Sequence, residues 1–222
     1  MTVTPLSPSA STGPRRERKK RQTRDALIAA GLELFETKGY EHTAVREITD
    51  TVDVSERTFF RYFASKEDLA LSFISEAARG LVDALAARPP GEDPLTALRA
   101  ALRDQMGRIS TSEGSSSGDL HSYVSVIKII EETPSLLAAQ LRYTHDHNDE
   151  IVRVLAEREG VDLATDLRPR ILAATFGALV FLANRDWRAN GDASIEAMLA
   201  SVDAYADQLG PALSGHWGSQ AG

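Results

Sequence analysis

Three side chains that can contact nucleic acid lie close together in the sequence: Arg57, Thr58 and Arg61. An arginine can donate two hydrogen bonds to a guanine edge, and a threonine hydroxyl can reach a phosphate oxygen. On a helix these positions share one broad face, while Phe59 and Phe63 can anchor the opposite face in a core. The combination indicates a short helix that enters the major groove of DNA.

The surrounding segment has the spacing of two short helices joined by a tight turn. Ile48 and Val52 give the first helix an inner face, and Asp53 with Val54 interrupts the helical pattern. Ser55 is the expected N-cap of the second helix, because its hydroxyl can accept a hydrogen bond from an amide at the helix start. The alternative interpretation is an ordinary helical hairpin with aromatic core residues and solvated arginines.

The run VREITDTVDVSERTFFRYFASKEDL resembles the helix-turn-helix signature of the TetR family of repressors, over about residues 23–71. The resemblance implies a three-helix DNA-binding domain, a connecting fourth helix, and a larger helical domain for ligand binding and dimerisation. Asp53 replaces the family's turn glycine, and aspartate tolerates left-handed backbone better than most residues. Phe60 stands where the family commonly has a phosphate-contacting tyrosine, whereas Tyr62 and Lys66 match directly.

Two further residues are assigned to DNA through the family pattern. Thr43 and Arg46 lie near DNA in that pattern, and Thr43 is also the expected N-cap of the helix before the turn. The expected DNA-binding residues are Thr43, Arg46, Ser55, Arg57, Thr58, Arg61, Tyr62 and Lys66. The implied partner is a double-stranded DNA operator, and a palindromic operator would match a homodimer.

The net charge of −7 is unevenly distributed along the chain. Residues 1–66 carry 12 Lys and Arg against 9 Asp and Glu, whereas the remainder carries 13 against 23. Seven of the basic residues lie between positions 15 and 24. We expect residues 1–21 to form a disordered basic arm, which either contacts the DNA backbone or minor groove or serves only as a solubilising tail.

Helical spacing predicts an all-α fold with two further domains. A helix-turn-helix DNA-binding domain is expected over residues 22–66, and a connecting helix with a ligand-binding and dimerisation domain over residues 67–215. The connecting helix should run from Leu69 to Leu85 and stop before Pro89. Additional helices are expected near residues 94–110, 119–132, 135–159, 163–189 and 193–210.

Composition restricts the class of protein. A chain of 222 residues with 42% apolar content can bury a sizeable core in one or two domains. It contains no cysteine, and its longest apolar stretch, residues 171–183, is too short to cross a bilayer. Because the N-terminus also lacks a secretory signal pattern, we expect a cytoplasmic protein with no membrane partner.

The C-terminal helices carry a pattern suited to dimerisation. The segment Ile171–Leu182 is apolar on nearly every face and includes the small residues Ala174, Gly177 and Ala178. A second apolar stripe consists of Ile195, Leu199, Val202, Ala206 and Leu209. Two such helices from each subunit could form a four-helix homodimer interface, as the resemblance implies. The alternative is a central helix that is fully buried in a monomer.

Large apolar and aromatic side chains on consecutive helices suggest a cavity for a small-molecule effector. The expected ligand-binding residues are Met106, Ile109, Tyr123, Ile127, Ile130, Arg142, Tyr143, Phe176 and Val180, with Leu141, His145 and Asn184 nearby. For any single one of these residues, plain core is the favoured interpretation, and it is the set as a whole that suggests a cavity. Residues 129–182 resemble the ligand domain of the mycofactocin-regulator type, some of whose relatives respond to acyl-CoA thioesters, and this resemblance implies a long-chain acyl-CoA as the ligand.

Other chemistry finds little support in the sequence. His145 and Asp149 could share a metal ion, but His145 and His147 are two residues apart and do not face each other on a helix, so solvated polar residues are favoured. There is no glycine-rich phosphate loop, nucleophile elbow or paired-carboxylate motif, so we expect neither an enzyme nor a cofactor.

The leading hypothesis is a repressor released by its ligand. The alternative is a helical sensor or interaction module without sequence-specific DNA binding.

Overall fold

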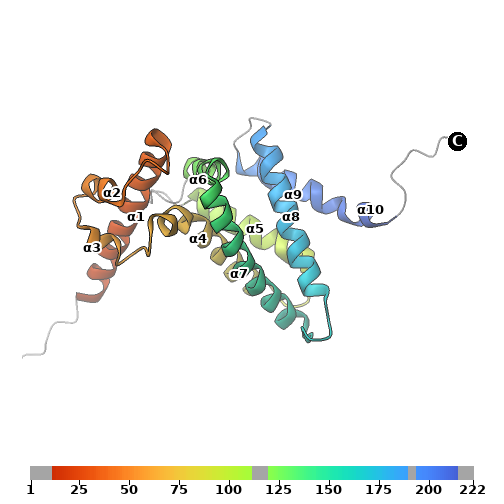
Figure 1. Cartoon of the computed structure of the whole chain (residues 1–222). Helices are drawn as coiled ribbons and strands as arrows, with labels where there is room; N and C mark the ends of the chain where they lie inside the picture. Colours follow the sequence, from red (N-terminus) through yellow and green to blue (C-terminus); the bar gives the residue numbers. More distant parts are fainter. Residues whose placement is uncertain (1–11, 112–119, 190–193, 215–222) are drawn as a thin grey trace, which may run out of the picture.

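The computed structural model describes residues 12–111, 120–189 and 194–214, and within these ranges the chain forms helices and turns only. Three helices form one end of the elongated molecule (Figure 1): α1 (Thr12–Lys38), α2 (Val45–Thr51) and α3 (Glu56–Phe59). The long helix α4 (Lys66–Ala86) leads from them into the larger part of the chain. The expected all-α class is confirmed.

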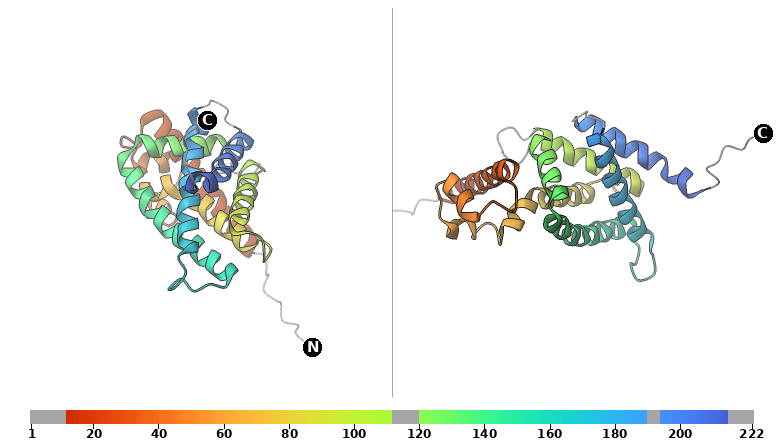
Figure 2. Two further views of the ribbon diagram at one scale, coloured as in Figure 1. Left: turned by 90° about the vertical axis from the view of Figure 1, so that its right-hand side faces the viewer. Right: turned by 45° about the horizontal axis from the view of Figure 1, so that its top comes forward.

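The larger part contains the remaining helices. They are α5 (Pro94–Thr111), α6 (Leu120–Glu132), α7 (Pro134–Glu159), α8 (Arg168–Ala189), α9 (Ile195–Asp207) and α10 (Leu209–Leu213). Helix α4 packs against both α5 and α7, and α8 packs against α7 and α9. Helix α6 also packs against α4, and the two further views in Figure 2 show the helical arrangement from other sides. Among the described helices, none combines the length and apolar character that a membrane span requires.

The DNA-binding end has its own apolar core. Ile28 of α1, Ile48 of α2, and Phe59 and Phe63 at α3 are all buried. The rings of Phe59 and Phe63 lie 5.5 Å apart between centroids, and Leu69 of α4 joins the same core. Burial of these aromatic side chains fixes the rotation of α3, so that its other face points to solvent.

Local signals explain where the helices begin and end. Asp53 adopts a left-handed backbone with φ of 53°, which turns the chain between α2 and α3. The Ser55 hydroxyl accepts from the Thr58 amide, and the Ser65 hydroxyl accepts from the Asp68 amide. The cap at Ser55 is the one that the sequence predicts. The expected cap at Thr43 is wrong, because Ala44 occupies the N-cap position of α2.

The N-terminal basic segment differs from its expected form. Helix α1 begins at Thr12, so residues 12–21 are helical rather than disordered, whereas residues 1–11 lie outside the described part of the chain. Lys, Arg and Gln are good helix formers, and Pro14 falls in the first turn, where its missing amide is tolerated. The basic side chains are therefore carried on a rigid helix and not on a flexible arm.

Candidate functional site

The solvent-facing side of α3 presents the side chains expected to read DNA. Arg57, Phe60 and Arg61 are exposed, whereas Phe59 is fully buried. Thr58 is half-buried, and its hydroxyl lies 3.0 Å from the Ser55 hydroxyl. Arg57 therefore projects from a short helix whose opposite face is anchored, and Arg61 lies in the turn that directly follows this helix. Exposed arginines on such an anchored unit suit insertion into a groove.

Helix α1 extends the basic surface beside α3. The Arg61 guanidinium lies 5.0 Å from the Tyr62 ring centroid and donates to the Tyr62 hydroxyl at 3.1 Å. A surface hollow next to this pair is lined by Arg16, Glu17, Lys19, Lys20 and Thr23 of α1, together with Arg61 and Tyr62. The fold thus places the basic N-terminal segment next to Tyr62, although nothing in the sequence indicates that these two parts of the chain lie side by side.

Two of the expected DNA contacts are engaged inside the protein. The Thr43 side chain is only 2% exposed, and its hydroxyl donates to the Gly39 carbonyl at 2.9 Å. The Lys66 ammonium donates to the carbonyls of Tyr40 at 2.6 Å and Thr43 at 2.9 Å, and it lies 4.1 Å from the Tyr40 ring centroid. Burial lowers the pKa of Lys66 from its usual value. These residues hold the connection between α1 and α2, and the structure gives no support to direct phosphate contact by either.

Arg46 lies on the exposed surface of α2. Its Nε is 3.8 Å from Asp50 Oδ2, one turn later on the same helix, and both side chains are largely exposed. Such an exposed pair is weak and readily exchanged for another partner. DNA contact by Arg46 therefore stays a prediction that is compatible with its position.

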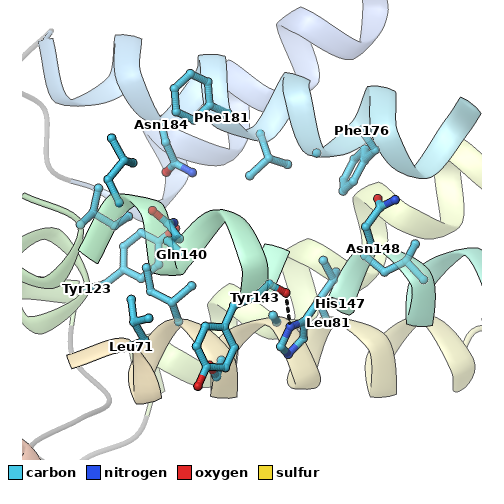
Figure 3. Close-up of a pocket in the computed structure, with 18 of the residues that line it drawn as sticks. Leu71, Leu81, Tyr123, Gln140, Tyr143, His147, Asn148, Phe176, Phe181 and Asn184 are labelled. Carbon is cyan, nitrogen blue, oxygen red and sulfur yellow. Dashed lines mark hydrogen bonds between the residues drawn. The ribbon is translucent and has the colours of Figure 1, made fainter. Parts of the chain in front are cut away.

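A cavity of about 290 Å³ lies between α4, α6, α7 and α8 (Figure 3). Its wall is mainly apolar and aromatic. Six residues named from the sequence line it: Tyr123, Ile127, Tyr143, Phe176, Val180 and Asn184. Concave, largely apolar spaces with a few polar groups are the usual sites for small molecules.

The other expected ligand residues lie elsewhere. Met106, Ile109 and Ile130 are buried in the core and do not reach the cavity wall. Leu141 is exposed, and so is Arg142, whose guanidinium lies 3.4 Å from the Glu67 carboxylate. These residues do not line this cavity. The side chain of His145 lies outside the described part of the structure.

The sequence analysis did not predict several residues that line the cavity, among them residues of α4, which was expected to be only a connecting helix. Leu71 and Ile74 of α4 line the cavity, and so do Gln140, His147 and Ile151 of α7. On α7 the lining positions are separated by three or four residues, which places them on one face of the helix. That spacing, with polar and aromatic residues among apolar ones, was a usable signal in the sequence.

The cavity contains specific polar groups as well as apolar walls. Tyr123 is hydrogen-bonded to the Asn184 side chain, and burial raises the pKa of Tyr123 above its usual value, so its hydroxyl stays protonated at neutral pH. His147 Nδ1 donates to the Tyr143 carbonyl at 2.8 Å, as the dashed line in Figure 3 shows. Arg188 donates to both carboxylate oxygens of Glu131.

Metal binding gains no support from the part of the chain that the structure describes. Within those residues, no group of three or more His, Asp or Glu side chains is placed to hold an ion. The suggested pair of His145 and Asp149 falls partly outside the described side chains.

Comparison with known families assigns both parts of the chain. Residues 27–73 match the family described as bacterial regulatory proteins, tetR family, and residues 92–213 match the MftR C-terminal domain. The chain belongs to the TetR family of transcriptional regulators. The resemblance to the TetR family is thereby confirmed for the N-terminal DNA-binding domain, and the resemblance to the mycofactocin-regulator type is confirmed for the C-terminal domain.

Individual relatives agree with this assignment. The chain is 42% identical to the HTH-type transcriptional regulator TcmR of Streptomyces glaucescens, over 97% of this chain and 96% of that protein. It is 26% identical to a protein of Mycobacterium tuberculosis named as the mycofactocin biosynthesis transcriptional regulator MftR, over 84% and 90% of the two chains. These relatives are named as regulators, and this TetR-family protein is a DNA-binding transcriptional regulator and not an enzyme.

Solved structures support the fold alone. The structure described as a SmeT–triclosan complex superposes with a TM-score of 0.56 at 17% identity, covering 83% of this chain and 90% of that one. NalD of Pseudomonas aeruginosa, a repressor of a multidrug efflux pump, gives a TM-score of 0.53 at 20% identity, covering 85% and 97%.

TetR regulators act as dimers, and the surface of α8 suits that assembly. Ile171 is 62% exposed and Phe181 is 59% exposed, with the small exposed residues Ala174 and Ala178 between them on one side of α8. An uncovered apolar stripe of this kind is typical of a protein interface. The stripe expected on α9 is mostly internal, because Ile195, Val202 and Ala206 are buried against the rest of their own chain. These three residues are therefore not available to a partner subunit, and a contribution of α9 to the interface stays a prediction.

Proposed function

We propose that this TetR-family regulator is a homodimeric repressor, and that a small apolar or amphipathic ligand in the α4–α8 cavity releases it from its operator. One observation carries the proposal: α4 forms a wall of the cavity and also packs against α1 of the DNA-binding end. A ligand that changes the position of α4 would therefore act on α1, which shares a buried core with α3.

The proposed operator contact uses both α3 helices of the dimer. Two reading helices about 34–36 Å apart enter successive major grooves on one face of a palindromic site. Arg57 and Arg61 would meet base edges and phosphates, and the basic face of α1 would follow the neighbouring backbone. The apolar stripe on α8 supports the dimer that this spacing requires.

Side-chain contacts couple α4 to helices at both ends. Arg24 of α1 pairs with Glu76 of α4, close to the DNA-binding core. At the other end, Arg158 of α7 donates to the carbonyls of Arg88, at 2.7 Å, and Pro89, at 3.0 Å, just beyond the end of α4. If α7 moves around a ligand, these contacts would therefore tilt α4, and α7 would not simply slide past it. The ligand must bind the released form more tightly, because equal affinity for both forms shifts nothing.

The cavity argues for a smaller ligand than the long-chain acyl-CoA implied by the resemblance. An acyl-CoA carries several phosphate charges, and cations are needed to bury them. Arg188 is the one Lys or Arg among the residues that line the described cavity, and it is already paired with Glu131. The coenzyme portion of an acyl-CoA would have to remain outside the cavity. We therefore propose only a small apolar or amphipathic ligand, and not a long-chain acyl-CoA.

An operator-binding experiment tests the DNA part of the proposal. Gel-shift titration with the DNA that flanks the protein's own gene should give a specific shift that is lost in the Arg57→Ala/Arg61→Ala variant. Arg153→Ala, an exposed arginine on α7, is the matched control and should bind like the wild type. Equal binding to flanking and unrelated DNA would instead favour a helical sensor without sequence-specific recognition.

A cavity-filling variant tests the release mechanism without a known ligand. Val180→Trp adds a large side chain to the wall of the cavity and should weaken operator affinity while leaving the protein dimeric. Arg153→Trp places the same side chain on an exposed surface and should not change DNA binding. If a folded, dimeric Val180→Trp protein bound the operator as tightly as the wild type, occupation of this cavity would not control release.

A further inference from the structure

We propose, building on the function above, that the effector is an uncharged, largely apolar ring compound whose hydroxyl group bonds both Asn184 and Tyr123. Two kinds of observation carry this assignment. One is the unfilled hydrogen-bonding capacity of the Asn184 amide. The other is the charge balance of the groups around it.

The Asn184 side chain is only 9% exposed and projects from α8 into the cavity (Figure 3). Its amide is hydrogen-bonded to Tyr123 of α6. Its Oδ1 atom is buried and has no hydrogen-bond partner among the described residues. A buried carbonyl oxygen without a partner is destabilising, so a ligand that donates a hydrogen bond there, after a small rotation of the amide toward the cavity, gains affinity.

One ligand hydroxyl can satisfy both side chains. With Oδ1 unpaired, the amide nitrogen of Asn184 is the donor to Tyr123, and the Tyr123 hydroxyl keeps its own proton for another acceptor. A hydroxyl oxygen donates one hydrogen bond and accepts others, so it can donate to Asn184 and accept from Tyr123. A carbonyl, an ether or a carboxylate can only accept, and would leave Asn184 Oδ1 unpaired.

The remaining walls favour rings. Phe176 of α8 lies on one side of the space in Figure 3, and Tyr123 and Tyr143 lie on the other. A flat ring between such walls gains from offset or edge-to-face aromatic contact. A cavity of about 290 Å³ is near the lower end of the range for small-molecule sites, which limits the ligand to a compact molecule.

The charges around the cavity are already matched. Glu131 and Arg188 neutralise each other, and His147 uses its Nδ1 hydrogen in the bond to the Tyr143 carbonyl. Together with Tyr123 and Tyr143, these are the titratable groups among the residues that line the described cavity. A carboxylate or phosphate group of a ligand inside the cavity would either disrupt the Glu131–Arg188 pair or remain unpaired itself, and either outcome is unfavourable.

Fluorescence titration of the full-length protein with three pyrenes tests the assignment. 1-Pyrenemethanol carries the hydroxyl, 1-methylpyrene lacks it, and 1-(methoxymethyl)pyrene accepts a hydrogen bond but cannot donate one. We expect the alcohol to bind about tenfold more tightly than either other compound, since only it can donate to Asn184. Palmitoyl-CoA should fail to displace the alcohol at an equal concentration.

Variants locate the preference within the cavity. Asn184→Leu should reduce affinity for the alcohol to that for 1-methylpyrene, and 1-methylpyrene itself should bind as before. Asn148→Leu removes a second amide from the same cavity and should keep the preference. Tyr123→Phe should lose part of the preference for the alcohol. If Asn184→Leu does not fold, the affinities measured with Tyr123→Phe test the proposal instead.

The proposal is overturned if the three pyrenes bind equally, if none binds, if the preference survives in Asn184→Leu, or if palmitoyl-CoA displaces the alcohol. Because the titration contains no DNA, its result is independent of operator release. Selective binding of the alcohol without release of the operator would refute the proposed repressor mechanism and leave the ligand assignment standing.

Discussion

Replacing Lys66 with alanine separates two roles that the residue type alone leaves open. As a phosphate contact, Lys66 would contribute to DNA affinity and little to folding. In the structure its ammonium donates to the carbonyls of Tyr40 and Thr43 and lies over the Tyr40 ring. Its removal leaves two backbone carbonyls without their donor in the connection between α1 and α2.

The size of the effect follows from these contacts. A hydrogen bond to a charged group contributes about 1.5–3 kcal/mol, and since Lys66 is half-buried, water replaces part of each bond, so we expect a total loss of about 2 kcal/mol. For a protein of this size, that loss corresponds to a decrease in Tm of roughly 4–8 °C. Differential scanning calorimetry of the wild type and Lys66→Ala measures the difference directly.

Lys20→Ala is the matched control, because Lys20 is exposed in the basic hollow between α1 and Tyr62. It should leave Tm unchanged and reduce the slope of log affinity against log salt by about one, as for the loss of one phosphate contact. The reverse pattern would refute our reasoning. A Lys66→Ala protein that melts like the wild type but has the smaller salt slope would make Lys66 a phosphate contact after all.

Three further changes test other parts of the structure. Arg57→Ala should relax base preference at one operator position by about 1–3 kcal/mol, and unchanged affinity ratios across operator variants would show that Arg57 reads no base. Ala178→Arg places a charge on the exposed stripe of α8, so the protein should sediment as a monomer with normal Tm, whereas a stable dimer would place the interface elsewhere. Glu47 accepts from the Ala44 amide and pairs with Lys38, and these contacts lower its pKa from the usual value of 4.5. The resulting stabilisation is present above pH 4.5 and is lost as pH falls through the lowered pKa, so Glu47→Gln should be less stable than the wild type at pH 7 and converge with it in acid. A stability difference independent of pH would contradict this assignment.

The sequence by itself determined the DNA-reading unit, because its signals are local. The turn at Asp53, the cap at Ser55 and the buried pair Phe59 and Phe63 each act within a few residues. Helical spacing and capping chemistry are properties of such short segments. The same reasoning located most helices of the larger domain, including α7, which begins at Pro134, one residue before the expected start.

The N-terminal segment shows where composition alone misleads. A cluster of Lys and Arg is compatible with a disordered tail and with a solvated helix. The structure continues α1 back to Thr12 and places Lys19 and Lys20 beside Arg61. This proximity depends on how α1 packs against the core that also holds α3, and no local signal in the first twenty residues contains that information.

Only the tertiary structure decided which apolar residues are core and which form the cavity. Met106, Ile130 and Phe176 have the same side-chain character in the sequence, yet only Phe176 reaches the cavity. The distinction depends on the rotation of each helix about its axis, which is set by packing against neighbouring helices. For the same reason Val202 of α9 is buried within its own chain, although its stripe suggested a partner subunit. The unpaired oxygen of Asn184 likewise follows from the three-dimensional arrangement. Only the positions of α6 and α8 in the fold bring Tyr123 to one end of that amide and leave the other end without a donor among the described residues.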